Sequence, residues 1–401
     1  MNIMNIMNIM NMNMKIARVK VTPVDTSFWG DFAARQDEHK LVTPMAKYPE
    51  YRHPLSSWFP NDSMCVVEIE TEDGQVGTGW CEDYCHTSSS IINQHLSRLL
   101  IGANPLNRNM LWDQMYRSTM PYGRKGPALH AISGIDIALW DLAGKHLGQP
   151  VHQLLGGRTR DSIPIYASGL HFTNEDEFTR EAAGYVSRGF KAMKMRFLHG
   201  PADGRDGMNR NIEIVELLRS TVGDDIDIMA DAYMGWDLEY ALQMCHALGP
   251  FNLKWVEEPL MPDQIRDYAA LRRASPVPIA AGEHETTRYG FAQLIEAEAL
   301  DIIQFDIGRV GGFSEAQRVC TLAQAAGLSV YPHAYGLPTL HLAASDDTIG
   351  MVEYFPVPAY EEHEETPLFD GAAIPLNGEI TLSDDPGLGV SLALPGFTPI
   401  R

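Results

Sequence analysis

Three acidic residues that end short apolar segments constrain the fold of this chain more than any other feature. Asp231 ends the segment DIDIMAD, Glu257 follows LKWV, and Glu283 ends VPIAAGE, so the three carboxylates lie at equal intervals of 26 residues. A parallel strand with its return helix takes roughly 25–30 residues. Equal spacing therefore predicts three neighbouring strands of a barrel that each carry a carboxylate at the same level.

The same three residues predict a metal site. Carboxylate oxygens are hard ligands, and three of them that converge while leaving room for water and substrate suit Mg²⁺. We therefore expect Asp231, Glu257 and Glu283 to be magnesium ligands.

Composition excludes several classes of partner. The 401 residues are enough for about two domains, or for one barrel with an added module. With 45% hydrophobic and 21% charged residues, the chain is typical of a soluble globular protein. Its net charge of −21 argues against nucleic acid and anionic membranes as partners. No apolar run approaches the roughly 20 residues that a membrane-spanning helix needs.

The cysteines and the first residues indicate a cytoplasmic protein. An odd number of cysteines in a long chain fits a reducing compartment better than a disulfide framework. Cys85 and His86 follow Cys81 closely, but no second Cys/His pair completes a zinc site. Residues 1–14 form a Met/Asn/Ile repeat without the features of a signal peptide, so we expect a disordered tail or a start placed too early. The cysteines are Cys65, Cys81, Cys85, Cys245 and Cys320.

Residues 15–150 are predicted to form an α+β capping domain. KIARVKVTPVDT reads as a strand, and MCVVEIETEDGQVGTGWC reads as a hairpin that turns at EDGQ. Residues 28–63 show no clear period and are long enough for a lid or specificity loop. Residues 87–147 read as helices, the last of which stops at Gly-Gln-Pro.

Residues 151–356 alternate between strand-like and helix-like segments, which predicts an α/β fold with a modified (β/α)7β TIM-type barrel. A doubly wound open sheet is the alternative, but no Gly-x-Gly-x-x-Gly follows an early strand. Residues 357–401 are rich in turns and are expected to pack back on the capping domain. The predicted strands are 162–168, 191–197, 225–232, 253–259, 277–283, 301–308, 328–334 and 351–356.

Further ionisable residues lie at the predicted strand ends, where barrel active sites are found. Asp306 and His333 come from adjacent strands and can form a carboxylate–imidazole pair, which fixes the tautomer of the imidazole and makes it a better base. Lys194 and Arg196 alternate on one strand and therefore share a face, where they can neutralise a substrate carboxylate. Surface charge and a buried, satisfied histidine are the ordinary alternatives.

Together these residues resemble the mandelate racemase subgroup of the enolase superfamily. The segment AISGIDIALWDLAGKHLGQPVHQLLGG (131–157) is similar to the junction between the two domains of that family. The resemblance implies three Mg²⁺ ligands, a His–Asp dyad and an acid, Glu353, that hydrogen-bonds the developing enolate. The segments TPMAKY, FNLKWVEE and GEH are most similar to acid-sugar dehydratases of the L-rhamnonate type.

The resemblance implies a cytoplasmic hydro-lyase that removes the α-proton of a sugar acid and expels its 3-hydroxyl. Its product would be a 2-keto-3-deoxy acid, and the protein would be a homo-oligomer, an octamer or a dimer. Many relatives have Lys-x-Lys where this chain has Lys194 and Arg196, and arginine is a poor base. A related substrate such as L-lyxonate is equally compatible. The alternatives are a racemase, epimerase or cycloisomerase with the same enediolate, and a barrel without catalytic activity.

Four further residues are candidates for substrate binding. His284 follows the predicted ligand Glu283, and Arg52 and His53 lie in the long segment expected to close over the barrel. Arg124 lies in a second capping-domain segment, Tyr122–Lys125. Solvated surface charge is the alternative for each loop residue.

Overall fold

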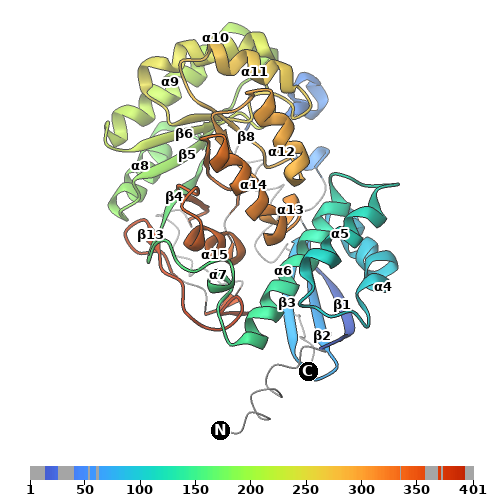
Figure 1. Ribbon diagram of the computed structural model, residues 1–401. Coiled ribbons are helices and arrows are strands. Elements are labelled where there is room, and N and C mark those ends of the chain that lie inside the picture. Colours follow the sequence, from blue (N-terminus) through green and yellow to red (C-terminus); the bar gives the residue numbers. More distant parts are fainter. Residues whose placement is uncertain are drawn as a thin grey trace.

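The computed structural model describes residues 14–25, 40–52, 55–59, 63–334, 336–356, 369–371 and 374–392. Figure 1 shows a small sheet covered by helices beside a larger barrel ringed by helices. Of the tail expected at residues 1–14, only Met14 is described, and it is buried. Residues 1–13 and the larger part of segment 357–401 lie outside the described residues.

The region predicted to form the capping domain is built on an antiparallel sheet with the strand order β1–β2–β3. The predicted hairpin is confirmed, because Glu70 of β2 pairs with Val76 of β3 around the EDGQ turn. Gly74 occupies the turn with φ +83°, a conformation that side chains other than glycine rarely adopt. The strands are β1 (Ile16–Asp25), β2 (Ser63–Thr71) and β3 (Val76–Glu82).

The long helix α6 (Pro127–Leu147) covers this sheet and is buried over most of its length. Its contact with β3 is close because of glycine: a Cβ atom on Gly79 would lie 2.3 Å from the carbonyl oxygen of Gly134. Gly148 ends the helix in the left-handed conformation, as the Gly-Gln-Pro stop predicts. The other helices are α3 (Thr87–Ile91), α4 (Ser97–Leu100), α5 (Arg108–Thr119) and α7 (Val151–Leu154).

All eight predicted barrel strands are present in the described part of the chain. They pair in parallel in the order β10–β9–β8–β7–β6–β5–β4–β11. A parallel bridge between Val330 of β10 and Ile349, just before β11, closes the ring. The strands are β4 (Ile163–Leu170), β5 (Ala192–Arg196), β6 (Asp227–Asp231), β7 (Trp255–Glu257), β8 (Ile279–Ala281), β9 (Ile302–Ile303), β10 (Ser329–Val330) and β11 (Val352–Tyr354).

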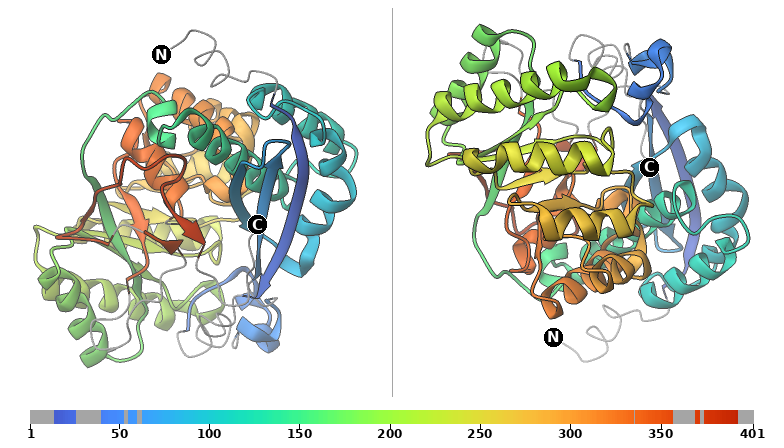
Figure 2. Two further views of the ribbon diagram at one scale, coloured as in Figure 1. Left: turned by 90° about the horizontal axis from the view of Figure 1, so that it is seen from below. Right: turned by 90° about the horizontal axis from the view of Figure 1, so that it is seen from above.

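Helices follow the first seven of these strands and form the outer layer, which confirms the (β/α)7β prediction. Figure 2 shows several of them running side by side over the strands. Each buries an apolar face against the ring, as an amphipathic helix should. The helices are α8 (Glu175–Ser187), α9 (Gly204–Val222), α10 (Leu238–Leu248), α11 (Ile265–Ala274), α12 (Thr287–Glu296), α13 (Ile307–Val310), α14 (Phe313–Ala325) and α15 (Leu337–Ser345).

Large side chains fill the inside of the barrel and form a floor for the site. The buried rings of Tyr166 and Trp255 meet edge to face with their centroids 5.7 Å apart, and Tyr331 lies 4.9 Å from Trp255. The barrel is therefore a packed core rather than a pore, and polar chemistry is confined to its rim.

The described part of the C-terminal segment contacts both domains. Gly387 accepts a hydrogen bond from the Val151 amide and donates one to the Gln149 carbonyl. The strand β13 (Glu379–Ile380) also pairs with β4 of the barrel, a contact that the sequence did not predict. β12 (Phe369–Asp370) and β14 (Ser391–Leu392) form a separate ladder.

Short helical turns complete the described structure. The turns are η2 (Pro44–Lys47), η3 (Pro49–Tyr51), η4 (Leu55–Ser57), η5 (Tyr84–His86), η6 (Ile92–Leu96), η7 (Pro201–Asp203) and η8 (Gly249–Phe251).

None of the helices in the described ranges is long and apolar enough to cross a membrane.

Candidate active site

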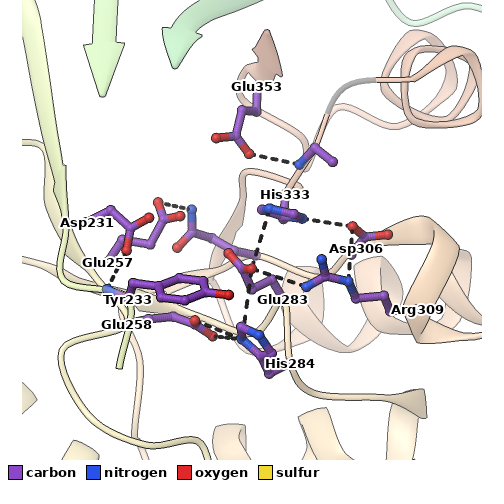
Figure 3. Close-up of polar contacts among 12 residues, drawn as sticks. Asp231, Tyr233, Glu257, Glu258, Glu283, His284, Asp306, Arg309, His333 and Glu353 are labelled. Atoms are coloured by element: carbon purple, nitrogen blue, oxygen red, sulfur yellow. Dashed lines mark hydrogen bonds and ion pairs between the residues drawn. The ribbon is translucent and has the colours of Figure 1, made fainter. Parts of the chain in front are cut away.

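The predicted site residues meet at one rim of the barrel. Arg196, Asp231 and Glu257 are the last residues of β5, β6 and β7 and lie side by side in register. Glu283 and Asp306 lie just beyond the ends of β8 and β9. Figure 3 shows these carboxylates turned toward a common space that also contains the His333 ring.

His333 and Asp306 form the predicted pair. His333 Nδ1 lies 2.8 Å from Asp306 Oδ2, and Asp306 Oδ1 accepts a hydrogen bond of 2.6 Å from the Gly308 amide. Since a carboxylate only accepts, the Nδ1–H group donates, and the tautomer of the ring is fixed. The other ring nitrogen, Nε2, lies 3.4 Å from Glu283 Oε1 and so faces the carboxylates (Figure 3).

Charges around this pair shift its pKa values strongly. Burial alone would lower the pKa of His333, but the charges of Glu283 and Glu353 and the hydrogen bond to Asp306 outweigh it and raise the pKa to about 9. Burial would raise the pKa of Asp306, yet Arg309 and His333 lower it to about 2. The imidazole is therefore a stronger base than an ordinary histidine.

Lys194 and Arg196 are both neutralised by buried carboxylates. Lys194 donates to Glu257, and its Nζ lies 2.7 Å from Glu353 Oε1. Burial opposes the charge of Lys194, but Glu257 and Glu353 raise its pKa above the ordinary value. Arg196 Nε lies 3.1 Å from Asp231 Oδ2, and no described residue hydrogen-bonds to Arg196 Nη1. Both side chains are therefore cations, and Arg196 retains a free donor.

Glu353, on β11, accepts hydrogen bonds from three sides. Its Oε2 accepts from the Ala334 amide at 2.8 Å, and its Oε1 accepts from Ser168 Oγ at 2.5 Å as well as from Lys194. Burial would raise its pKa, but Lys194 and His333 hold it far below the usual range. This environment favours the carboxylate, whereas donation of a hydrogen bond to an enolate requires the acid form. The role implied for Glu353 by family resemblance therefore stays a prediction.

The predicted metal ligands are buried but partly engaged by protein groups. Glu257 Oε1 accepts from Lys194, and Oε2 accepts from Trp255 Nε1 at 2.9 Å and Gln304 Nε2 at 2.7 Å. Within the described ranges, a different trio, Glu258, Glu283 and His284, has possible ligand atoms that all lie within 4.8 Å of one another. The trio predicted from spacing thus shares Glu283 with this group and remains a prediction.

The charge balance of the rim fits a divalent cation. Among the described residues of the rim, six buried carboxylates face three Lys or Arg side chains and the imidazoles of His284 and His333, whose pKa values are raised. Burying unpaired negative charge is costly, and a dication would offset that excess. Oxygen donors on rigid strand ends also match what Mg²⁺ prefers. The carboxylates are those of Asp231, Glu257, Glu258, Glu283, Asp306 and Glu353, and the cations are Lys194, Arg196 and Arg309.

The candidates for substrate binding fall in different places. His284 Nδ1 lies 2.9 Å from Glu258 Oε2, and burial would lower its pKa but the charge of Glu258 raises it. Arg52 Nη1 lies 3.3 Å from Asp203 Oδ1, so its charge is paired with the barrel. Arg124 is exposed, and its carbonyl accepts from Thr286 Oγ1 at 3.2 Å. His53 lies outside the described residues.

Four rim residues were not among the predicted ones. Arg309 binds Glu283, Gln304 binds Glu257, and Ser168 binds Glu353. Tyr233 donates its backbone amide to Asp231 Oδ1 at 2.7 Å, and its ring lies within the cluster (Figure 3). A possible signal for Arg309 was its position one helical turn after Asp306. The others are uncharged and carry no comparable signal.

Comparisons with known proteins agree with this architecture. Residues 54–156 match the model described as "Mandelate racemase / muconate lactonizing enzyme, N-terminal domain", and residues 177–395 match "Enolase C-terminal domain-like". The L-rhamnonate dehydratase of Saccharopolyspora erythraea is 37% identical over 390 residues, which cover 94% of this chain and 97% of that protein.

Two solved structures extend the likeness. The rhamnonate dehydratase of Gibberella zeae complexed with Mg is 34% identical, with a TM-score of 0.83 and 94% of each chain covered. The L-talarate dehydratase of Polaromonas sp. JS666, complexed with Mg and L-glucarate, is 28% identical, with a TM-score of 0.76 and 95% of each chain covered. The chain therefore belongs to the mandelate racemase and muconate lactonizing enzyme family of the enolase superfamily.

Proposed function

We propose that this protein is a Mg²⁺-dependent acid-sugar dehydratase that converts an aldonate to a 2-keto-3-deoxy acid. The observation that carries the proposal is that His333 is paired as a base with Asp306 while Lys194 and Arg196 are both held as cations. A racemase that uses two bases needs a second proton acceptor, and a salt-bridged arginine is a poor one. Elimination needs only one base that can return its proton. Two relatives named as dehydratases support this choice.

His333 Nε2 is the atom we assign to proton transfer, because Nδ1 is bound to Asp306. The α-carbon loses its proton to Nε2, and the electrons of the C–H bond pass into the carboxylate group of the substrate. The protonated Nε2 then donates to the 3-hydroxyl as the C3–O bond breaks and water leaves. The resulting enol tautomerises to the 2-keto acid.

The carboxylates Asp231, Glu257 and Glu283 are the groups we propose for holding Mg²⁺. When bound, the ion would supply positive charge to the substrate carboxylate as negative charge develops there. Arg196 Nη1, which is buried and has no hydrogen-bond partner among the described residues, is the donor we propose for the same carboxylate. Asp306 keeps the His333 ring in its productive orientation throughout.

The substrate is proposed to be an L-rhamnonate-like or L-lyxonate-like acid. A panel of aldonates that contains both, incubated with Mg²⁺, tests this proposal by formation of a semicarbazone from the 2-keto product. We expect keto acid from at least one member and none after chelation of the metal. Exchange of the α-hydrogen in D₂O without keto acid would instead indicate a racemase, an epimerase or a cycloisomerase. Neither reaction with any member would indicate a barrel without catalytic activity.

We also propose that the protein is a homo-oligomer, either an octamer or a dimer. Analytical ultracentrifugation of the full chain distinguishes these states from a monomer.

A further inference from the structure

Arg309 connects the catalytic rim to the capping domain. It lies on α13 and is 13% exposed. Its Nη1 donates to Glu283 Oε1 at 3.1 Å, and its Nε lies 3.7 Å from Asp306 Oδ2. One guanidinium therefore neutralises both a proposed metal ligand and the carboxylate that orients His333 (Figure 3).

The third partner of Arg309 comes from the other domain. Glu82 is the last residue of β3, and its Oε1 accepts from Arg309 Nε at 2.9 Å and from Nη2 at 2.5 Å. These are the shortest bonds of Arg309, so Glu82 fixes the plane of the guanidinium. The guanidinium is rigid and planar, so once Nε and Nη2 are held by Glu82, the remaining donor Nη1 points in a defined direction.

We propose that Glu82 and Arg309 are positioning residues through which docking of the capping domain completes the active site. This inference rests on the proposed function. With the capping domain in place, Glu82 holds Arg309, and Arg309 holds Glu283 and Asp306 at the geometry that His333 requires. Without Glu82, the guanidinium is free to reorient toward either carboxylate. Groups that orient ligands in this way typically contribute about 10- to 100-fold in metal affinity or activity.

The test uses Glu82→Gln, which keeps the shape of the side chain but removes its charge. At saturating Mg²⁺ we expect kcat to fall about 10- to 100-fold. KM should change little, because neither residue is placed against substrate. Calorimetric titration with Mg²⁺ alone should show affinity weakened by about 10-fold, since Arg309 becomes a less neutralised cation beside Glu283. Glu82→Asp, which keeps the charge, should recover part of both losses.

Lys125→Gln is the matched control. Lys125 of the capping domain pairs with Glu285 of the barrel at 2.6 Å, and Glu285 also accepts from the amide of Thr286. This variant removes one ion pair between the same two domains without touching Arg309. It should keep kcat and Mg²⁺ affinity within about twofold of the parent, as expected for a partly exposed pair.

A double-mutant cycle separates a specific link from general damage. If Glu82 acts through Arg309, Glu82→Gln and Arg309→Lys should be non-additive, with a double variant little worse than the poorer single one. Equal effects of Glu82→Gln and Lys125→Gln, or full additivity, would overturn the inference. An inactive parent protein would overturn the proposed function instead. In that case the effect of Glu82 through Arg309 would still be tested by the Mg²⁺ affinity of the variants, because this measurement requires no turnover.

Discussion

Lys194 Nζ lies 2.7 Å from Glu353 Oε1, with both side chains at 0% exposure. Lys194 also donates to Glu257, so a single ammonium group neutralises carboxylates on two different strands. A buried charge that loses its partner is much more costly than the pair itself is stabilising. Glu257 and Glu353 therefore both depend on Lys194 for charge compensation.

Lys194→Met should destabilise the metal-free protein by roughly 3–5 kcal/mol, because two buried carboxylates lose their cation. Urea unfolding in the presence of a chelator measures the change. Lys254→Met is the control: Lys254 pairs with Asp227 at 2.7 Å, but the side chains are 26% and 49% exposed. That variant should cost less than about 1 kcal/mol. Equal losses in the two variants would contradict the importance of burial.

His333→Asn should lower kcat by about 10²- to 10⁴-fold, because it removes the group that accepts the α-proton. Asparagine can still hydrogen-bond to Asp306, so the fold should be retained, as circular dichroism would show. Formation of keto acid by the parent and the variant is compared under the same conditions. Unchanged turnover would exclude His333 as the base.

The pKa of His333 should depend on the metal. The charges of Glu283 and Glu353 help to raise it to about 9. A cation bound at Glu283 would cancel part of that negative charge, so Mg²⁺ should lower the pKa. NMR titration of labelled histidine, with His333→Asn to assign the signal, measures both states. Since the base must be neutral, kcat/KM should fall as the pH drops below the metal-bound value. A pKa that rises with Mg²⁺ would contradict this arrangement.

Removal of the metal should abolish turnover and lower stability. Binding of an ion to the folded state alone adds about 2.7 kcal/mol when the ion is present at roughly 100 times its dissociation constant. Thermal unfolding with and without Mg²⁺ measures the effect. Asp231→Asn should reduce the Mg²⁺-dependent stabilisation, because it removes one proposed ligand charge. An equal stabilisation in that variant would show that Asp231 is not a ligand.

A buried histidine pair should make the C-terminal segment sensitive to acid. His341 Nε2 lies 3.1 Å from the Leu388 carbonyl, and its Nδ1 lies 3.2 Å from His152 Nδ1. Burial lowers the pKa of His341 to about 4. Folding therefore favours the neutral form of His341. The folded state keeps this stabilisation in full above the pKa of His341 in the unfolded chain, near 6.5, and loses it as the pH falls through about 4.

The expected loss from His341 is roughly 3 kcal/mol between about pH 7 and pH 4. His341→Gln keeps an acceptor and a donor but does not titrate. Its unfolding free energy should therefore fall less over this range than that of the parent. Parallel pH profiles for the two proteins would rule out His341 as the source.

The sequence predicted the barrel well because buried parallel strands appear as apolar runs, and the active-site residues follow at their C-terminal ends. All eight predicted strands occur, but several are shorter than expected. Glu283 and His333, for example, lie in the loops just after β8 and β10 rather than within them. Backbones at a barrel rim leave the ladder to turn into the next helix, and apolar periodicity does not mark that point.

The partners of each charged residue could not be predicted in the same way. From the sequence, Lys194 is a candidate to neutralise a substrate carboxylate, whereas the structure pairs it with Glu257 and Glu353. Arg52 is a candidate for substrate binding with surface charge as the alternative, and the structure pairs it with Asp203 of η7. Such choices depend on distances of a few ångströms between segments far apart in the sequence, which spacing alone does not determine.

Ser168 of β4 bonds to Glu353 of β11 across a separation of 185 residues, where the last strand closes the barrel against the first. A ribosome releases these strands in order, so a nascent chain that lacks β11 has neither a closed ring nor Glu353. Lys194 then lacks one of its two partners, and Ser168 faces an open edge. We therefore expect an unfinished chain to have an incomplete rim, with Lys194 and Ser168 both lacking the Glu353 carboxylate.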